Sequence, residues 1–331
     1  MSDLAGRKAL VTGAGGFIGG HLTEMLVRQG AEVRGLARYN SRNERGTLDW
    51  LDSEISSQVE VILGDIRDLE SVARAVDGVD VVFHLAAQIA IPYSYLNPRD
   101  FFETNVLGTF NVAQASLGAG VRRMIHTSTS EVYGTAQVVP ITEDHPLEPQ
   151  SPYAASKLGA DKLVDSYNRS FELPTVVLRP FNTFGPFQSA RAVIPTIISQ
   201  ALAGGPLKLG SLDPRRDMTF VTDTAAGFVA AATAGEQAVG RTVQLGTGFD
   251  VAIGDIVAMV GEILGRELDV ELDSERVRPP ASEVLRLISG PELASELIGW
   301  RPTVDLREGL SRTIDYIGQN LSRYRTDEYV R

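Results

Sequence analysis

The chain has 331 residues, of which 43% are hydrophobic and 22% charged, so it can bury a large core and form two lobes. Its net charge of -11 argues against nucleic acid as a partner, although a local basic pocket for a phosphorylated small molecule is compatible with it. The absence of cysteine excludes disulfides and thiolate chemistry, and the four histidines lack metal-ligand spacing, so we expect a metal-free site.

Short apolar runs alternate with helical stretches in the first half of the chain. The expected strands are 8–13, 32–37, 59–65, 79–87, 122–130 and 175–180. The expected helices are 18–29, a stretch after Asp68, 101–119 and 153–171. This alternation predicts a doubly wound parallel sheet with helices on both faces, a Rossmann domain of the α/β class.

The pattern loosens after Pro180. Helical stretches at 193–204, 255–265 and 306–320 and a strand at 207–210 predict a smaller C-terminal α/β lobe for the substrate. We therefore divide the chain into 1–180 and 181–331, with the second part interleaved with the first. No apolar run reaches the roughly 20 residues that span a bilayer, and no signal-peptide pattern is present, so the expected location is the cytoplasm, away from membranes.

A glycine-rich loop joins the first strand to the first helix. In VTGAGGFIGG, the residues Gly13, Gly16 and Gly19 have GxxGxxG spacing, with Phe17 and Ile18 between the last two. Glycine permits a tight turn and lets backbone N–H groups approach a pyrophosphate. Glycine-rich turns also occur without a ligand, but this position in a βαβ pattern favours dinucleotide binding.

The end of the second strand helps to choose the cofactor. A carboxylate there would bind the adenosine ribose of NAD, whereas this chain has Ala37 followed by Arg38. Arg38 could meet a 2'-phosphate, and the alternative is a solvated surface arginine. The sequence favours NADP, with NAD as the alternative.

Two further motifs carry reactive groups. Tyr153 and Lys157 lie four residues apart on an expected helix, so their side chains can share one face. A nearby ammonium is expected to lower the phenol pKa from its reference value near 10, which would make Tyr153 a base. In TSTSEVYG, Glu131 follows a run of hydroxyls at a strand end, and it is either an acid-base group or an ordinary ion-paired glutamate.

The order GxxGxxG, STS, YxxxK resembles that of the extended short-chain dehydrogenase/reductases, and the resemblance covers essentially the whole chain. Within this family the chain is similar to nucleotide-sugar 4,6-dehydratases of the GDP-mannose type, through GLARYNSRN, STSEVYG, RPPASEVLRLISG and LIGWRP. It also resembles bacterial dehydratases of nonulosonic-acid (legionaminic) pathways, through IAIPYSY, EPQSPYAASK and FNTFGPFQSARAVIPTII.

This resemblance assigns expected roles. It implies that Thr129, Tyr153 and Lys157 form a redox triad and that Glu131 removes the C5 proton of a hexose oxidised at C4. Water then leaves from C6 and hydride returns there. It further implies cofactor contacts from Asp65, Ile66, Leu85, Ala86 and Ala87, and substrate contacts from Ser94, Asn182, Arg191, Arg216, Arg278 and Glu283.

Ser130 is the departure that keeps other reactions open. Glucose-type 4,6-dehydratases have an aspartic acid there as proton donor, whereas serine is a weak acid better suited to orienting a group or a water. UDP-glucuronate decarboxylases share STSEVYG and need no such donor. The sequence therefore predicts a 4,6-dehydratase acting on UDP- or GDP-N-acetylglucosamine, with a decarboxylase, a 4-epimerase and a silent NADP-binding regulator as alternatives. The family also implies a homodimer through helices 101–119 and 153–171.

Overall fold

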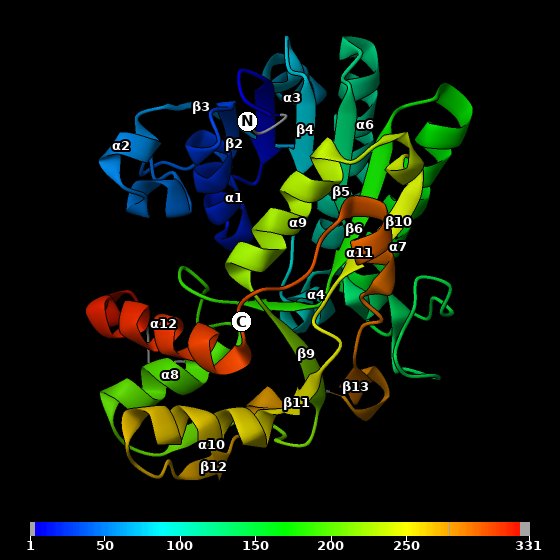
Figure 1. The fold of residues 1–331 in the computed structure, drawn as a ribbon. Helices are drawn as coiled ribbons and strands as arrows, with labels where there is room; N and C mark the ends of the chain where they lie inside the picture. Colours follow the sequence, from blue (N-terminus) through cyan, green and yellow to red (C-terminus); the bar gives the residue numbers. More distant parts are fainter. Residues whose placement is uncertain (1–3, 278, 325–331) are drawn as a thin grey trace.

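The computed structural model describes residues 4–277 and 279–324, which form two lobes (Figure 1). The larger lobe is built on one parallel sheet of seven strands in the order β3-β2-β1-β4-β5-β6-β10. Its strands are β1 (Lys8–Thr12), β2 (Glu32–Arg38), β3 (Val59–Gly64), β4 (Val81–His84), β5 (Arg123–Thr127), β6 (Thr175–Pro180) and β10 (Arg241–Leu245). The doubly wound fold expected from the alternating pattern is confirmed.

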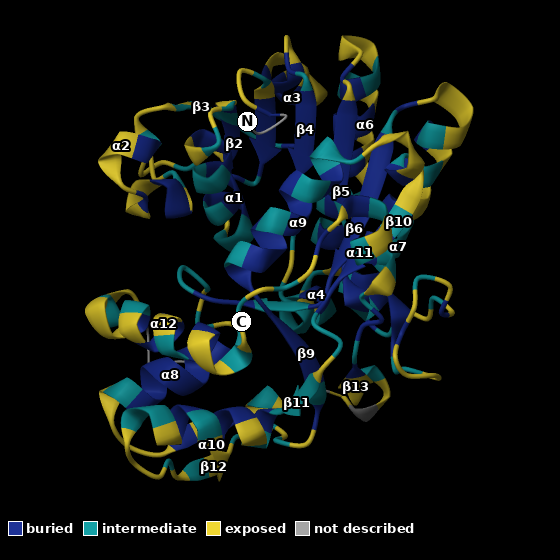
Figure 2. Cartoon of the chain, in the orientation of Figure 1, coloured by how far each residue is buried: buried dark blue, intermediate teal, exposed yellow. Residues whose placement is uncertain are grey.

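Helices cover both faces of this sheet, because alternate side chains of each strand point to opposite faces. In β1, Ala9 and Val11 pack in one core with α1 and α9, whereas Leu10 packs in another with α3, α6 and α7. The covering helices are α1 (Phe17–Arg28), α3 (Leu69–Val76), α6 (Gly108–Ala119), α7 (Pro152–Phe171), α9 (Val221–Thr233) and α11 (Glu292–Ile298). The central strands, such as β1 and β4, are accordingly buried between two layers, whereas the edge strand β3 is only partly buried (Figure 2).

The predicted helix over 101–119 is interrupted. Helix α5 (Pro98–Phe102) leads into a wide π turn, η2 (Glu103–Leu107), and α6 begins only at Gly108. The π turn presents Asn105, whose side chain donates to Gln88 O at 2.9 Å and accepts from Gln88 N at 2.7 Å. The interruption therefore anchors the loop after β4, a common use of π turns near functional sites.

The smaller lobe packs around its own apolar core, which includes Ile197, Phe220, Ile256 and Leu310. Its helices and strands are β7 (Asn182–Phe184), α8 (Val193–Ala203), β8 (Leu207–Leu209), β9 (Arg215–Phe220), β11 (Asp250–Ala252), α10 (Ile253–Leu264), β12 (Val270–Leu272), β13 (Arg286–Leu287) and α12 (Leu306–Gln319). After residue 180 the chain returns to the large lobe with α9, β10 and α11. A single boundary in the sequence therefore does not separate the two lobes.

Short helical segments complete the described fold. They are η1 (Gly46–Trp50), α2 (Ser53–Ser56), α4 (Ile91–Leu96), η3 (Ser130–Tyr133), η4 (Glu236–Ala238), η5 (Ser274–Arg276), η6 (Pro280–Ser282) and η7 (Leu321–Arg323). None of the helices in the described ranges is both long enough and apolar enough to cross a membrane.

Candidate active site

A cavity of about 900 Å³ is lined by residues of both lobes at the carboxyl ends of the parallel strands. The chain runs from β1 outward to β2 and β3, and from β4 outward through β5 and β6, so the strand order reverses between β1 and β4. Open α/β sheets bind ligands at this reversal. The volume lies in the range of small-molecule and cofactor sites.

The glycine loop forms a tight cradle at one end of the cavity. Gly13 has φ +74°, and a Cβ atom there would lie 2.8 Å from Ala86 N. A Cβ atom on Gly19 would lie 2.1 Å from Gly13 O, so neither position accepts a side chain without backbone movement. Gly16, Phe17 and Ile18 line the cavity at the start of α1. These residues fit a pyrophosphate held against a helix N-terminus.

The loop after β2 supports this cradle, through residues just beyond the GLARYNSRN stretch that the sequence singled out. Thr47 donates from N to Gly15 O at 3.0 Å and from Oγ1 to Gly16 O at 2.8 Å. A Cβ atom on Gly15 would lie 2.4 Å from Arg45 O. The segment after β2 therefore lies directly on the glycine loop, and Asn40, Glu44 and Arg45 line the same cavity.

Arg38 is exposed at the end of β2 and lines the cavity. Within the described ranges its side chain forms no hydrogen bond or ion pair, so it can meet a ligand. Asp65, also at the cavity, is bound by Arg67 at 2.7 Å, which lowers the pKa of its carboxyl. Ile66 and the loop residues Leu85, Ala86 and Ala87 complete this wall.

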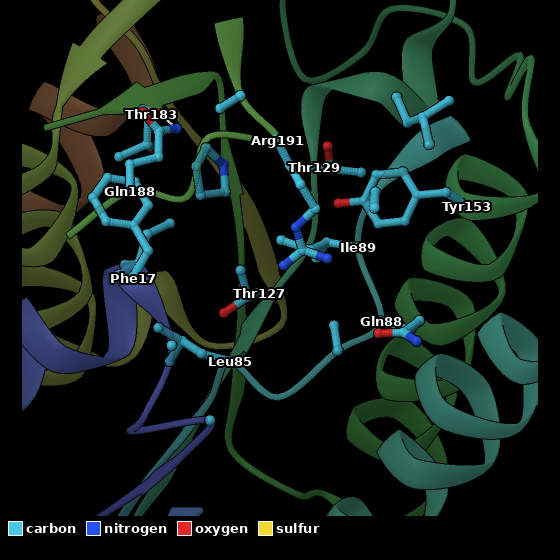
Figure 3. Close-up of a pocket in the computed structure, with 18 of the residues that line it drawn as sticks. Phe17, Leu85, Gln88, Ile89, Thr127, Thr129, Tyr153, Thr183, Gln188 and Arg191 are labelled. Carbon is cyan, nitrogen blue, oxygen red and sulfur yellow. Dashed lines mark hydrogen bonds between the residues drawn. The ribbon is translucent and has the colours of Figure 1, made fainter. Parts of the chain in front are cut away.

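Thr129, Tyr153 and Lys157 come together at the middle of the cavity, and Figure 3 shows Thr129 and Tyr153 on the same wall. Thr129 caps η3 and accepts a hydrogen bond from Glu131 N at 3.2 Å. Tyr153 and Lys157 come from the first two turns of α7, which begins at Pro152 after the cap residue Ser151. Burial lowers the pKa of Lys157 to about 8.

The expectation of a lowered phenol pKa is wrong. Burial raises the pKa of Tyr153 to about 12, and the negative charges of Glu131 and Asp161 add to this rise. Hydrogen bonding by Thr129 acts in the opposite direction but is weaker. The phenol is removed from water and has carboxylates nearby, so burial outweighs any stabilisation of the phenolate by the ammonium.

Glu131 lines the cavity beside this group. Its backbone N–H is bonded to Thr129, while its carboxylate has no hydrogen bond or ion pair to any residue that the structure describes. The interpretation of Glu131 as an ordinary ion-paired glutamate is therefore not supported. A partly buried carboxylate facing a ligand cavity is suited to proton transfer.

On the small-lobe side, the cavity is lined by Asn182, Arg191, Arg216 and Glu283. Arg216 is buried and donates to Glu283 at 3.2 Å. The guanidinium of Arg191 points into the cavity (Figure 3). Asn182 Oδ1 is buried without a hydrogen-bond partner among the described atoms, which marks a position where a ligand donor would be favourable.

Two expected site residues are not at the cavity, and a third lies outside the described residues. Ser94 is fully buried and does not line the wall. Its hydroxyl donates a hydrogen bond to Ile91 O at 2.7 Å within the first turn of α4. Ser130 is also buried and absent from the wall, since η3 directs Thr129 and Glu131 there instead. Arg278 lies outside the described residues.

The sequence reasoning also missed cavity residues. Thr127 Oγ1 and Gln188 Oε1 are buried at the wall without a hydrogen-bond partner in the described part of the chain, and Arg276 lines it as well. Gln188 is held by its amide nitrogen, which donates to Thr183 O at 2.8 Å. Thr127 begins the TSTSE run and Gln188 lies three residues before Arg191, so proximity to assigned residues was the available signal.

Comparison with known proteins decides the family. The sequence model described as GDP-mannose 4,6 dehydratase matches residues 10–313. The chain belongs to this family. It is thus an enzyme of the nucleotide-sugar epimerase/dehydratase group within the extended short-chain dehydrogenase/reductases, which confirms the predicted family.

Relatives carry several activities. A UDP-glucose 4-epimerase of Mycolicibacterium smegmatis is 34% identical, with 93% of this chain and 98% of the relative aligned. The structure of Pal from Bacillus thuringiensis superposes with a TM-score of 0.86 at 33% identity, covering 95% of this chain and 99% of that one. The dTDP-glucose 4,6-dehydratase DesIV from Streptomyces venezuelae, solved with NAD, gives a TM-score of 0.87 at 31% identity, covering 96% and 98%.

Proposed function

We propose that this enzyme is a nucleotide-sugar 4,6-dehydratase. The observation that carries the proposal is the Glu131 carboxylate, which lines the cavity next to Thr129 and Tyr153 and has no partner within the described residues. Oxidation of a hexose at C4 acidifies the proton at C5, and a positioned carboxylate can remove that proton. An epimerase has no need of a base at C5.

The roles of the residues follow from the chemistry. A nicotinamide dinucleotide would be held by the glycine loop, Arg38, Asp65, Ile66 and residues 85–87. The chemistry that this group supplies when bound is to accept hydride from C4 and to return it to C6. Thr129 orients the C4 hydroxyl, and Tyr153 takes its proton. Because burial, together with the nearby carboxylates, raises the pKa of Tyr153 to about 12, the ionised phenol requires a positive charge close to it in the loaded enzyme.

Water loss is assigned to Glu131 alone. It takes the C5 proton and gives a proton to the hydroxyl that leaves C6, so the elimination is balanced without a second acid. Ser130 does not line the cavity, and the one aspartic acid on its wall within the described residues, Asp65, is bound by Arg67. C5 regains a proton when C6 is reduced, and the proton that Tyr153 took from the C4 hydroxyl balances this step, so the overall product is a 4-keto-6-deoxy sugar nucleotide.

We propose a nucleotide-diphosphate sugar as substrate, with UDP- or GDP-N-acetylglucosamine as the leading candidates. Arg191 and Arg216 on the small-lobe wall support a diphosphate contact, since guanidinium groups bind phosphate oxygens through paired donors. NADP is the favoured cofactor because Arg38 lines the cavity and its side chain forms no hydrogen bond or ion pair with the described residues, and NAD is the alternative that the ligand of DesIV supports.

A decarboxylase is the second candidate. The absence of Ser130 from the cavity wall leaves Glu131 as the acid-base residue of this strand end, and loss of carbon dioxide needs no donor at C6. A 4-epimerase is supported by the Mycolicibacterium relative, and a silent NADP-binding regulator only by the fold.

Product mass separates these candidates. The purified protein is incubated with UDP-GlcNAc, GDP-GlcNAc, dTDP-glucose and UDP-glucuronate in the presence of NAD or NADP. Loss of water supports the dehydratase, loss of carbon dioxide the decarboxylase, and an isomer of unchanged mass the epimerase. Cofactor binding without turnover of a wider sugar-nucleotide panel would favour the regulator.

A homodimer is proposed through the outer faces of α5, α6 and α7. Phe102, Leu107, Phe110 and Phe171 are large apolar residues that remain exposed there, Leu107 with 56% of its surface accessible. Exposed apolar clusters of this kind favour association. Light scattering coupled to size exclusion tests the proposal, with Leu107→Glu expected to give monomer if it is correct.

A further inference from the structure

Asp161 is a buried carboxylate that the catalytic scheme has not used. It lies on α7 one turn beyond Lys157, in the same i, i+4 relation that links Lys157 to Tyr153. Both Asp161 and Lys157 have only 3% of their surface accessible. A buried carboxylate persists in proteins where charged and hydrogen-bonding partners offset its desolvation.

The partners of Asp161 come from two neighbouring strands. Ser128 Oγ donates to Asp161 Oδ2 at 2.7 Å, and Arg179 donates to the same oxygen from Nη2 at 3.1 Å and from Nε at 3.3 Å. His126 Nε2 lies 3.3 Å from Asp161 Oδ1. One carboxylate therefore connects α7 to the ends of β5 and β6.

Arg179 also contacts a second residue, Tyr133. Its Nη1 donates to the Tyr133 hydroxyl at 2.9 Å, and its guanidinium lies 5.0 Å from the centre of the Tyr133 ring. Gln244 donates to the same hydroxyl at 2.8 Å. Arg179 is thus held in place on both sides. Against the effect of burial, the contacts with His126 first, and then those with Arg179 and Ser128, keep the pKa of Asp161 below its usual value.

The described groups that interact electrostatically with Lys157 are Asp161 on α7, His84 on β4 and His126 on β5. Lys157 also lines the cavity together with Tyr153 and with Glu131 of η3. Burial lowers the pKa of both histidines, and neighbouring positive charge, including that of Lys157, lowers each further, which favours their neutral forms. Asp161 is the anion that favours the charged form of Lys157 against burial.

We propose that Asp161 is a positioning residue of the reaction centre, which keeps Lys157 in its ammonium form and, through Ser128, fixes the strand end that carries Thr129. The inference rests on the proposed function, in which Lys157 and Thr129 serve oxidation at C4. Ser128 is adjacent to Thr129 in the chain and its N–H is bonded to Leu178 O, so a shift of Ser128 moves Thr129 relative to Tyr153.

The first test measures the titration of Lys157 directly. The 13Cε signals of labelled lysines are followed against pH by NMR, and the Lys157 signal is assigned with Lys157→Arg. In Asp161→Asn, loss of the carboxylate favours the neutral amine, so the midpoint moves down by about 1 pH unit or more. Asp165→Asn, which removes a partly exposed carboxylate paired with Arg169 on the same helix, leaves the midpoint unchanged.

Asp161→Asn leaves Arg179 buried without its anion and can unfold the protein. The double variant Asp161→Asn/Arg179→Gln removes both charges and is tested in parallel, with circular dichroism as the check on folding. It is expected to show the same downward shift of the Lys157 midpoint. A wild-type midpoint in the folded single or double variant overturns the electrostatic part of the proposal.

The second test uses turnover. The alkaline limb of the kcat profile moves to lower pH in Asp161→Asn, because the ammonium is lost earlier, so the deficit is largest at alkaline pH. Ser128→Ala keeps the charge and is expected to lower kcat while KM and the Lys157 midpoint stay near wild type. Unchanged kcat in Ser128→Ala overturns the positioning part. If the wild type converts no sugar nucleotide, the proposed function fails, while the NMR midpoints still decide the role of Asp161.

Discussion

The two ends of the cavity are built in different ways. At the large-lobe end, glycines bring backbone atoms so close that a Cβ atom on Gly19 would lie 2.1 Å from Gly13 O, and the backbone shapes the site. At the small-lobe end, the side chains of Asn182, Gln188, Arg191 and Arg216 make the wall. A site shaped by backbone tolerates little change of sequence, whereas a side-chain wall can be altered residue by residue for a new ligand.

The largest effect is expected from a substitution at the large-lobe end of the cavity, which is shaped by backbone atoms. Gly19→Ala places a methyl group on Gly13 O, so the loop must open, and dinucleotide binding is expected to fall below detection by calorimetry. Gly118→Ala in α6 is the matched control, because no atom lies within 4 Å of its Cβ position. This control should bind normally. Normal cofactor affinity in Gly19→Ala would show that the loop is not the cradle.

The reaction centre between the two ends is the next target. Tyr153→Phe removes the base, and the rate of C4 oxidation is expected to fall by about 10²–10⁴-fold with sugar-nucleotide affinity retained. Tyr167→Phe, on the same helix and bonded to Gln114, provides the control. Single-turnover reduction of the bound cofactor measures the effect. A rate within a few-fold of wild type would remove Tyr153 from the mechanism.

The side-chain end should respond in affinity more than in rate. Arg191→Gln removes one charged contact of about 1.5–3 kcal/mol, so KM for the sugar nucleotide should rise roughly 10- to 100-fold while kcat changes less. Arg169→Gln on the surface of α7 should leave KM unchanged. An unchanged KM in Arg191→Gln would place the diphosphate elsewhere.

The smallest effect concerns the choice between cofactors. Arg38→Ala removes one charge-assisted contact to a 2'-phosphate, so affinity for NADP should fall about tenfold. Affinity for NAD, measured by fluorescence quenching in the same variant, should change little. If the affinities for NADP and NAD fell equally, Arg38 would not be the residue that contacts the 2'-phosphate.

The difference between the ends also explains how much could be predicted from the sequence. The sheet and helix α7 could be predicted because each follows from a local period, and the glycine spacing marked its loop. Ser94 and Ser130 were misplaced because short helical turns bury their side chains, which no local pattern indicates. The raised pKa of Tyr153 depends on burial by distant segments, and the proximity of Thr47 to the glycine loop depends on tertiary packing.

The central claim is that Glu131 is the base at C5, and product mass with Glu131→Gln tests it most directly. The amide keeps the size of the side chain but cannot accept the proton. We expect water loss to fall by about 10²–10⁴-fold while substrate still reduces the bound cofactor, so reduced cofactor and the C4-oxidised sugar accumulate. Loss of water at the wild-type rate in Glu131→Gln would contradict the account.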